Sequence, residues 1–95
     1  MKMKSSKEMG KLIVMVDNAN YDNYITEVFE TLQLNLEKNG KRIGDVICHE
    51  FSYGGKNGLL EIMGCGIKDE DGNDDVKGYL TAEECFEIIR RYYES

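Results

Sequence analysis

Residues 45–67 constrain the fold most, because their pattern is that of a β-hairpin that other elements must cover. Residues 46–53 are rich in β-branched and aromatic side chains, and residues 59–63 are apolar again. Between them, Asn57 and Gly58 form the pair that tight type I′ turns favour. We therefore expect a β-hairpin that turns at Asn57-Gly58 and supplies most of one sheet face.

Two amphipathic stretches flank this hairpin and are predicted to be helices. The first begins near Asn20 and ends at Asn39-Gly40, a pair that tolerates the left-handed conformation typical of a helix C-terminus. Its apolar residues recur at helical spacing: Tyr21, Ile25, Val28, Phe29, Leu32 and Leu36. The second follows a capping box, in which Thr81 accepts from the third helical amide and Glu84 reaches back to the cap.

Residues 11–16, KLIVMV, form a continuous apolar run of the kind found in a buried strand. The predicted order is β-α-β-β-α, which gives an α+β fold: a three-stranded mixed sheet with both helices packed on one face. Residues 1–10 are polar and basic, so we expect a flexible lead-in, with a short helical turn at residues 5–10 as the alternative. Residues 11–95 then form a single compact domain.

Charge and cysteine content limit the functions open to this chain. The formal net charge is −6, and residues 1–11 carry four Lys against one Glu, so the remaining chain is more acidic still. Such a body repels a phosphate backbone and suits a protein partner with a basic surface. The three cysteines have no regular spacing and no apolar run is long enough to span a membrane, so we expect a cytoplasmic protein without direct nucleic-acid or membrane binding.

The predicted binding residues lie on an acidic loop and among the tyrosines. Residues 68–77 read KDEDGNDDVK, a charged segment between the hairpin and the last helix. Exposed tyrosines make good anchors, because a large amphipathic ring gives contact area at low entropic cost. The expected partner-binding residues are Asp69, Asp71, Asp74, Asp75, Tyr79 and Tyr92, with Tyr24, Tyr53 and Tyr93 as further anchors.

The glycine-rich segment SYGGKNG, residues 52–58, supports an alternative function. Glycine-rich turns can aim backbone amides at an anion, and a lysine adds charge. A small anionic or nucleotide-like ligand would then be held or sequestered by Tyr53, Gly54, Gly55, Lys56 and Asn57.

Catalysis and metal binding have weaker support in the sequence. Cys48, His49 and Glu50 cannot form a triad on a strand, because the side chain of His49 would point to the opposite face. Residues 73–84 match the second half of an EF-hand loop, but Lys77 stands where a cation ligand is required. We therefore predict no catalytic residue, no metal and no cofactor.

The segments SYGG (52–55), GLLEIMG (58–64) and GYLTAEE (78–84) resemble small proteins encoded by phages and prophages of Gram-positive bacteria. The resemblance covers residues 46–94 and implies an accessory protein that binds and inhibits a host or defence protein. The sequence thus predicts a non-catalytic acidic binding module. If residues 11–16 lie at a sheet edge, strand pairing between two copies is expected to give a homodimer.

Overall fold

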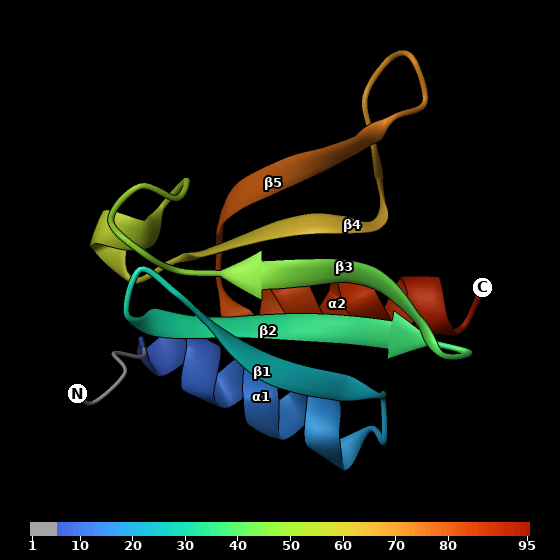
Figure 1. The fold of residues 1–95 in the computed structure, drawn as a ribbon, viewed down its shortest axis with the longest axis horizontal. Helices are drawn as coiled ribbons and strands as arrows, with labels where there is room; N and C mark the ends of the chain where they lie inside the picture. The colour runs from blue at the N-terminus through green and yellow to red at the C-terminus, as the bar shows by residue number, and fades with distance from the viewer. Residues whose placement is uncertain (1–5) are drawn as a thin grey trace.

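The computed structural model describes residues 6–95, which form an α+β fold with two helices and a five-stranded sheet (Figure 1). The expected lead-in falls partly outside the described residues, and its residues 7–10 form the first turn of a helix. The elements follow in this order: α1 (Lys7–Asn18), β1 (Asn23–Val28), β2 (Thr31–Lys38), β3 (Lys41–Ile47), the 3-10 turn η1 (Gly55–Asn57), β4 (Leu60–Lys68), β5 (Asp74–Leu80) and α2 (Ala82–Tyr93).

The sheet is an antiparallel meander in which each strand pairs with the next along the chain, in the order β1-β2-β3-β4-β5. Both helices lie on one face of it (Figure 1). The predicted three-stranded mixed sheet with β-α-β-β-α order is therefore wrong. The expected strand at residues 11–16 is helical, the residues expected to form the first helix contribute β1 and β2, and the second half of the expected acidic loop belongs to β5. The edges of the sheet are β1 and β5. Residues 11–16 are not a strand, so two copies cannot pair through them as expected.

Residues 11–16 belong to helix α1 instead of a strand. Met9, Leu12 and Val16 lie on its buried face, whereas Val14, in the middle of the apolar run, is 58% exposed. The helix starts at Ser6, whose hydroxyl accepts from the backbone N–H of Met9 at 3.1 Å. A continuous apolar run of this length fits either a strand or a half-buried helix, and the N-cap decides between them.

The predicted first helix is the hairpin of β1 and β2. Leu34 and Leu36 point into the core, whereas Gln33 and Asn35 carry a hydrogen-bonded polar layer on the opposite face. The helix stop expected at Asn39-Gly40 is the tight turn to β3, with φ of 55° and 78° at its two residues.

The hairpin predicted around Asn57-Gly58 is present as an antiparallel pair, but its connection is different. Strand β3 ends at Ile47 and β4 starts at Leu60, and Val46 faces Ile62 across the pair. The residues between them form a long loop that contains η1, and Gly58 follows η1 in a left-handed conformation. Asn57-Gly58 is therefore part of a compact loop and not a two-residue turn.

Helix α2 has the predicted start. The Thr81 hydroxyl accepts from the Glu84 N–H at 3.2 Å, and the Glu84 carboxylate accepts from the Thr81 N–H at 3.0 Å. Glu8 of α1 accepts from the Ala82 N–H at 2.8 Å, which ties the two helices together at this end. The capping box is confirmed in full.

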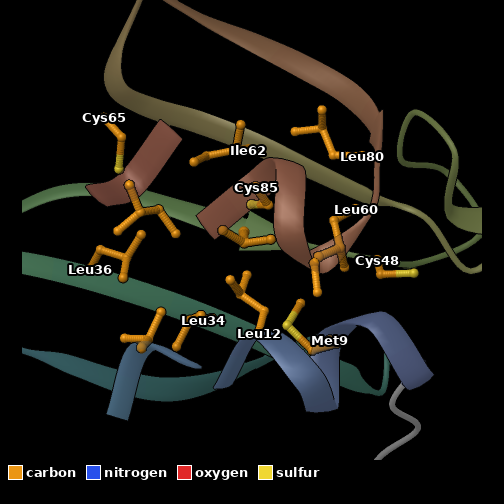
Figure 2. Packing of buried hydrophobic residues seen from close by; sticks show 14 residues of the cluster. Met9, Leu12, Leu34, Leu36, Cys48, Leu60, Ile62, Cys65, Leu80 and Cys85 are labelled. Atoms are coloured by element: carbon orange, nitrogen blue, oxygen red, sulfur yellow. The ribbon is translucent and has the colours of Figure 1, made fainter. Parts of the chain in front are cut away.

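The core lies between the sheet and the two helices, as Figure 2 shows. Leu12 and Met9 of α1 and Cys85 of α2 meet side chains from the inner face of the sheet. The fully buried members include Leu34, Leu36, Val46, Leu60, Ile62 and Ile89. No helix within residues 6–95 is long and apolar enough to cross a membrane.

Candidate functional site

Large aromatic side chains stand exposed at one end of the sheet. Phe29 is 63% exposed, Phe51 70%, Tyr53 59% and Tyr79 61%. They come from the β1–β2 turn, the β3–β4 loop and the end of β5, which lie together on the left of Figure 1. We call these four residues the aromatic end. Folded proteins seldom leave this much aromatic surface in one place without a binding role.

Phe29 is held out by a strained turn. It occupies the β1–β2 turn with Glu30, and Val28 faces Thr31 across the last pair of the hairpin. The backbone φ is 48° at Phe29 and 61° at Glu30, so both have the positive values that a type I′ turn requires. Such turns normally use Asn or Gly, because a side chain costs roughly 1 kcal/mol or more in this conformation. The chain accepts this cost and places an aromatic ring at the tip.

His49 lies beneath the exposed phenylalanines. Its ring centroid is 4.8 Å from that of Phe29, and the rings of Phe29 and Phe51 meet edge to face at 5.1 Å. The imidazole Nδ1 accepts from the backbone N–H of Phe51 at 3.1 Å, and the residue is only 9% exposed. His49 therefore fixes the position of Phe51 and supports both rings from below.

Close backbone packing fixes the loop that carries Phe51 and Tyr53. The Ser52 hydroxyl donates to the His49 carbonyl at 2.8 Å and accepts from the His49 N–H at 2.9 Å. A Cβ on Gly55 would lie 1.7 Å from the His49 carbonyl oxygen, so no larger residue fits there. The SYGG motif thus has a structural explanation, which is a tight loop closed on His49.

The loop also docks against the end of β5. The Tyr79 N–H donates to the Tyr53 carbonyl at 3.2 Å. A Cβ on Gly78 would lie 2.2 Å from the Cβ of Tyr53. Tyr79 has a positive φ of 57°, another strained residue that carries an exposed ring. This contact holds the backbones of Tyr53 and Tyr79 side by side, and a separate ring contact joins Phe29 and Phe51.

Acidic side chains border the aromatic end. Glu30 adjoins Phe29 in sequence, Glu50 adjoins Phe51, and both glutamates are exposed. Glu50 also lines two shallow hollows of about 250 Å³ and 210 Å³, each shared with Lys56. Within the part of the chain that the structure describes, Glu30, Glu50 and Lys56 thus give the exposed rings a rim of mixed charge.

The predicted acidic loop lies at the other end of the β4–β5 hairpin. Asp69 accepts from the backbone N–H groups of Asp71 and Asn73, at 2.9 and 3.0 Å, and so holds the turn together. Asp74 pairs with Lys68 across the hairpin, and Asp75 accepts from the Val76 N–H at 2.8 Å. Asp69, Asp74 and Asp75 thus have local structural roles, and the structure does not bring the aspartates together with Tyr79.

The remaining predicted tyrosines are used in different ways. Tyr92 lies against β4, and the Lys38 ammonium sits 5.3 Å from its ring centroid. Tyr93 stacks on Tyr21 at 4.1 Å and donates to the carbonyls of Asp22 and Glu37, so it packs within the fold. Tyr24 is 42% exposed on β1, away from the aromatic end.

The segment predicted to hold an anion has most of its amides engaged within the loop. The N–H groups of Asn57 and Leu59 both donate to the Gly54 carbonyl, and that of Gly55 donates to Ser52. The Tyr53 N–H donates to the Glu61 carboxylate at 2.9 Å. A carboxylate of the chain itself therefore stands where a bound anion would accept from this N–H. The geometry gives the ligand-binding alternative no specific support.

The cysteines are reduced and buried. Burial, with a smaller effect of the Asp45 charge, raises the pKa of the Cys65 thiol to about 12, and burial also raises the pKa of Cys85. The Cys48 thiol donates to the Gly55 carbonyl at 3.8 Å. Residues 6–95 contain no group of three or more His, Cys, Asp or Glu side chains placed to hold a metal.

Sequence reasoning missed Phe29 and Phe51. Phe29 fits the apolar spacing of the predicted first helix, and Phe51 lies in the segment 46–53 that is expected to form a strand. The usable signal was the alternation of residues 31–38, TLQLNLEK, which indicates a strand and leaves Phe29 in a turn. Comparison of the chain with protein-family models, curated proteins and solved structures finds no match.

Proposed function

We propose that this chain is a non-catalytic binding module that docks a protein partner through the aromatic end. One observation carries the proposal: Phe29 and Phe51, two of the three phenylalanines, are more than 60% exposed and touch each other. Large exposed aromatic side chains gathered at one end of a fold are typical of the central anchors of an interface.

The strain beneath these rings supports the same function. Phe29, Glu30 and Tyr79 all have positive φ, where Gly or Asn would be easier to accommodate. Strained residues persist where the surrounding structure enforces them, and they cluster at binding sites. His49 and the Ser52 hydroxyl hold the neighbouring loop that carries Phe51, and the His49 ring also lies against Phe29. A preorganised surface of this kind loses little entropy on binding.

Charge indicates the kind of partner. Glu30 and Glu50 flank the rings, and the whole chain has a net charge of −6. The complementary surface is an apolar cup with lysine or arginine at its rim, which would also accelerate association at low salt. With the resemblance of residues 46–94 to phage-encoded proteins, this favours an inhibitor that covers a basic functional surface of a host protein.

Affinity capture from a Gram-positive bacterial lysate tests the proposal with two matched variants. Phe29→Ser combined with Phe51→Ser removes the anchors, and Tyr24→Ser removes an exposed ring elsewhere on the sheet. We expect a protein that is retained by the wild type and by Tyr24→Ser and is lost by the double variant. That protein, once purified, should bind the wild type in a saturable way by calorimetry. Equal capture by all three chains, with unchanged circular dichroism, would remove the proposal.

A further inference from the structure

Strand β4 contains a wide bulge. Gly64, Cys65 and Gly66 all have positive φ, of 79°, 51° and 87°, which is rare for three consecutive residues. Pairing with β5 breaks between Met63 and Lys68, so that four residues of β4 stand opposite one residue of β5. Bulges of this kind redirect a strand and are enriched beside functional sites.

The bulge forms one wall of a hollow with a volume of about 480 Å³. The C-terminal half of α2 forms the facing wall. Ile67, Ile88 and the Tyr92 ring provide apolar lining, and Gly66 presents no side chain to it. This volume is within the range of small-molecule sites, which are mostly apolar with a few polar groups.

Two cations line the same hollow from opposite walls, Lys77 on β5 and Arg91 on α2. Lys77 faces the helix side of the sheet, because its partner in register is the core residue Ile62. Its ammonium has no ion-pair partner within 4.0 Å among residues 6–95, although Lys77 shares a neighbouring hollow with Glu83, Glu84 and Glu87. Arg91 donates from Nε to Glu87 at 3.0 Å, and no contact of its terminal nitrogens occurs in that part of the chain. Donors are therefore available from both walls.

We propose that this hollow binds a small apolar carboxylic acid, with its hydrocarbon part against Ile67, Ile88 and Tyr92 and its carboxylate between Lys77 and Arg91. The charge complementarity carries the choice, since a chain of net charge −6 places two cations around an apolar floor. Cys65 does not oppose the anion, because burial keeps its thiol neutral at ordinary pH through a raised pKa. This site is independent of the aromatic end.

Heteronuclear NMR titration with 4-phenylbutanoate tests the site, with 4-phenyl-1-butanol as the uncharged counterpart. We expect saturable amide shifts in residues 64–67 and 88–92 for the acid, and at least about fivefold weaker binding for the alcohol. Lys77→Met and Arg91→Met should each weaken the acid by a similar factor. Lys41→Met, an exposed lysine near the β2–β3 turn, should leave binding unchanged.

The variants fold independently of the proposal, because both cationic side chains are exposed, and thermal unfolding of each variant checks this. The proposal is overturned if acid and alcohol bind equally, if Lys77→Met and Arg91→Met bind as the wild type does, or if no saturable shift appears. Shifts confined to residues 49–58 would overturn it as well, because they would place the acid at the glycine-rich loop.

Discussion

The rings of Phe29 and Phe51 meet edge to face at 5.1 Å, although one lies in the β1–β2 turn and the other in the β3–β4 loop. Both remain more than 60% exposed, so the contact does not serve to bury them. His49 lies against both rings and fixes the backbone of Phe51. Two separate segments are thus held so that they present one aromatic surface.

Relief of strain at Glu30 should stabilise the fold and leave the aromatic anchors in place. Glu30→Gly removes a side chain from a residue with φ of 61°. We expect the free energy of unfolding in urea to rise by about 1 kcal/mol, because Gly adopts this conformation without steric cost. Partner capture should persist, since Phe29 remains in place, and should weaken mainly at low salt, because one carboxylate beside the rings is lost. A fall in stability would show that the turn is not strained.

A methyl group at Gly78 should disrupt the aromatic end. The added Cβ would lie 2.2 Å from the Cβ of Tyr53, so the loop or β5 must move. We expect Gly78→Ala to lower the free energy of unfolding by about 2 kcal/mol or more and to weaken partner capture. Gly10→Ala is the matched control, because its Cβ has nothing within 4 Å and lies in α1. That control should be neutral or slightly stabilising.

Stability should fall in alkaline solution. The Cys65 thiol has a pKa of about 12 in the folded chain against an ordinary value of 9.0, so above pH 9 the unfolded chain releases a proton that the folded chain keeps. The free energy of unfolding then decreases with rising pH, by about 1.4 kcal/mol per unit for each such thiol. The raised pKa of Cys85 acts in the same direction. Urea titrations of the wild type and of a Cys65→Ala/Cys85→Ala variant between pH 8 and 11 measure this slope, which should be smaller in the variant.

The acidic loop, residues 68–77, should contribute to local structure more than to binding. Asp69→Asn, Asp71→Asn, Asp74→Asn and Asp75→Asn together remove four charges from it. Loss of the Lys68–Asp74 pair and the weaker turn should lower the melting temperature slightly, since exposed ion pairs contribute little. Capture should be reduced mainly at low salt, where long-range attraction to a basic partner acts. Complete loss of capture at 150 mM salt would show that the partner binds at this turn and not at the aromatic end.

The parts of the fold that sequence predicted are those with a local chemical signal. Thr81 and Glu84 satisfy each other's backbone groups within four residues, so the start of α2 could be read without tertiary information. The apolar run at residues 11–16 had no such signal for strand or helix. Helix α1 forms there because Ser6 caps its N-terminus and because one face of the helix is buried against the core.

The β1–β2 hairpin could not be recognised in the sequence for a different reason. Its turn consists of Phe29 and Glu30, neither of which is a turn-forming residue, so the usual punctuation between two strands is absent. Phe29 is also one of the exposed rings of the aromatic end. This part of the candidate surface could therefore not be predicted from the usual turn residues. Asn39-Gly40, in contrast, is a typical turn pair, and it forms the turn between β2 and β3. Its interpretation as the end of a helix was wrong.

Site-specific photo-crosslinking tests the aromatic end most directly. A benzophenone amino acid replaces Phe51 in one chain and Tyr24 in a second, and each chain is irradiated in the same lysate. We predict one dominant crosslinked protein from position 51 that is absent from position 24 and disappears when unlabelled wild-type chain is added in excess. The same crosslinked products from both positions, or a product at position 51 that survives competition, would contradict binding through Phe29 and Phe51.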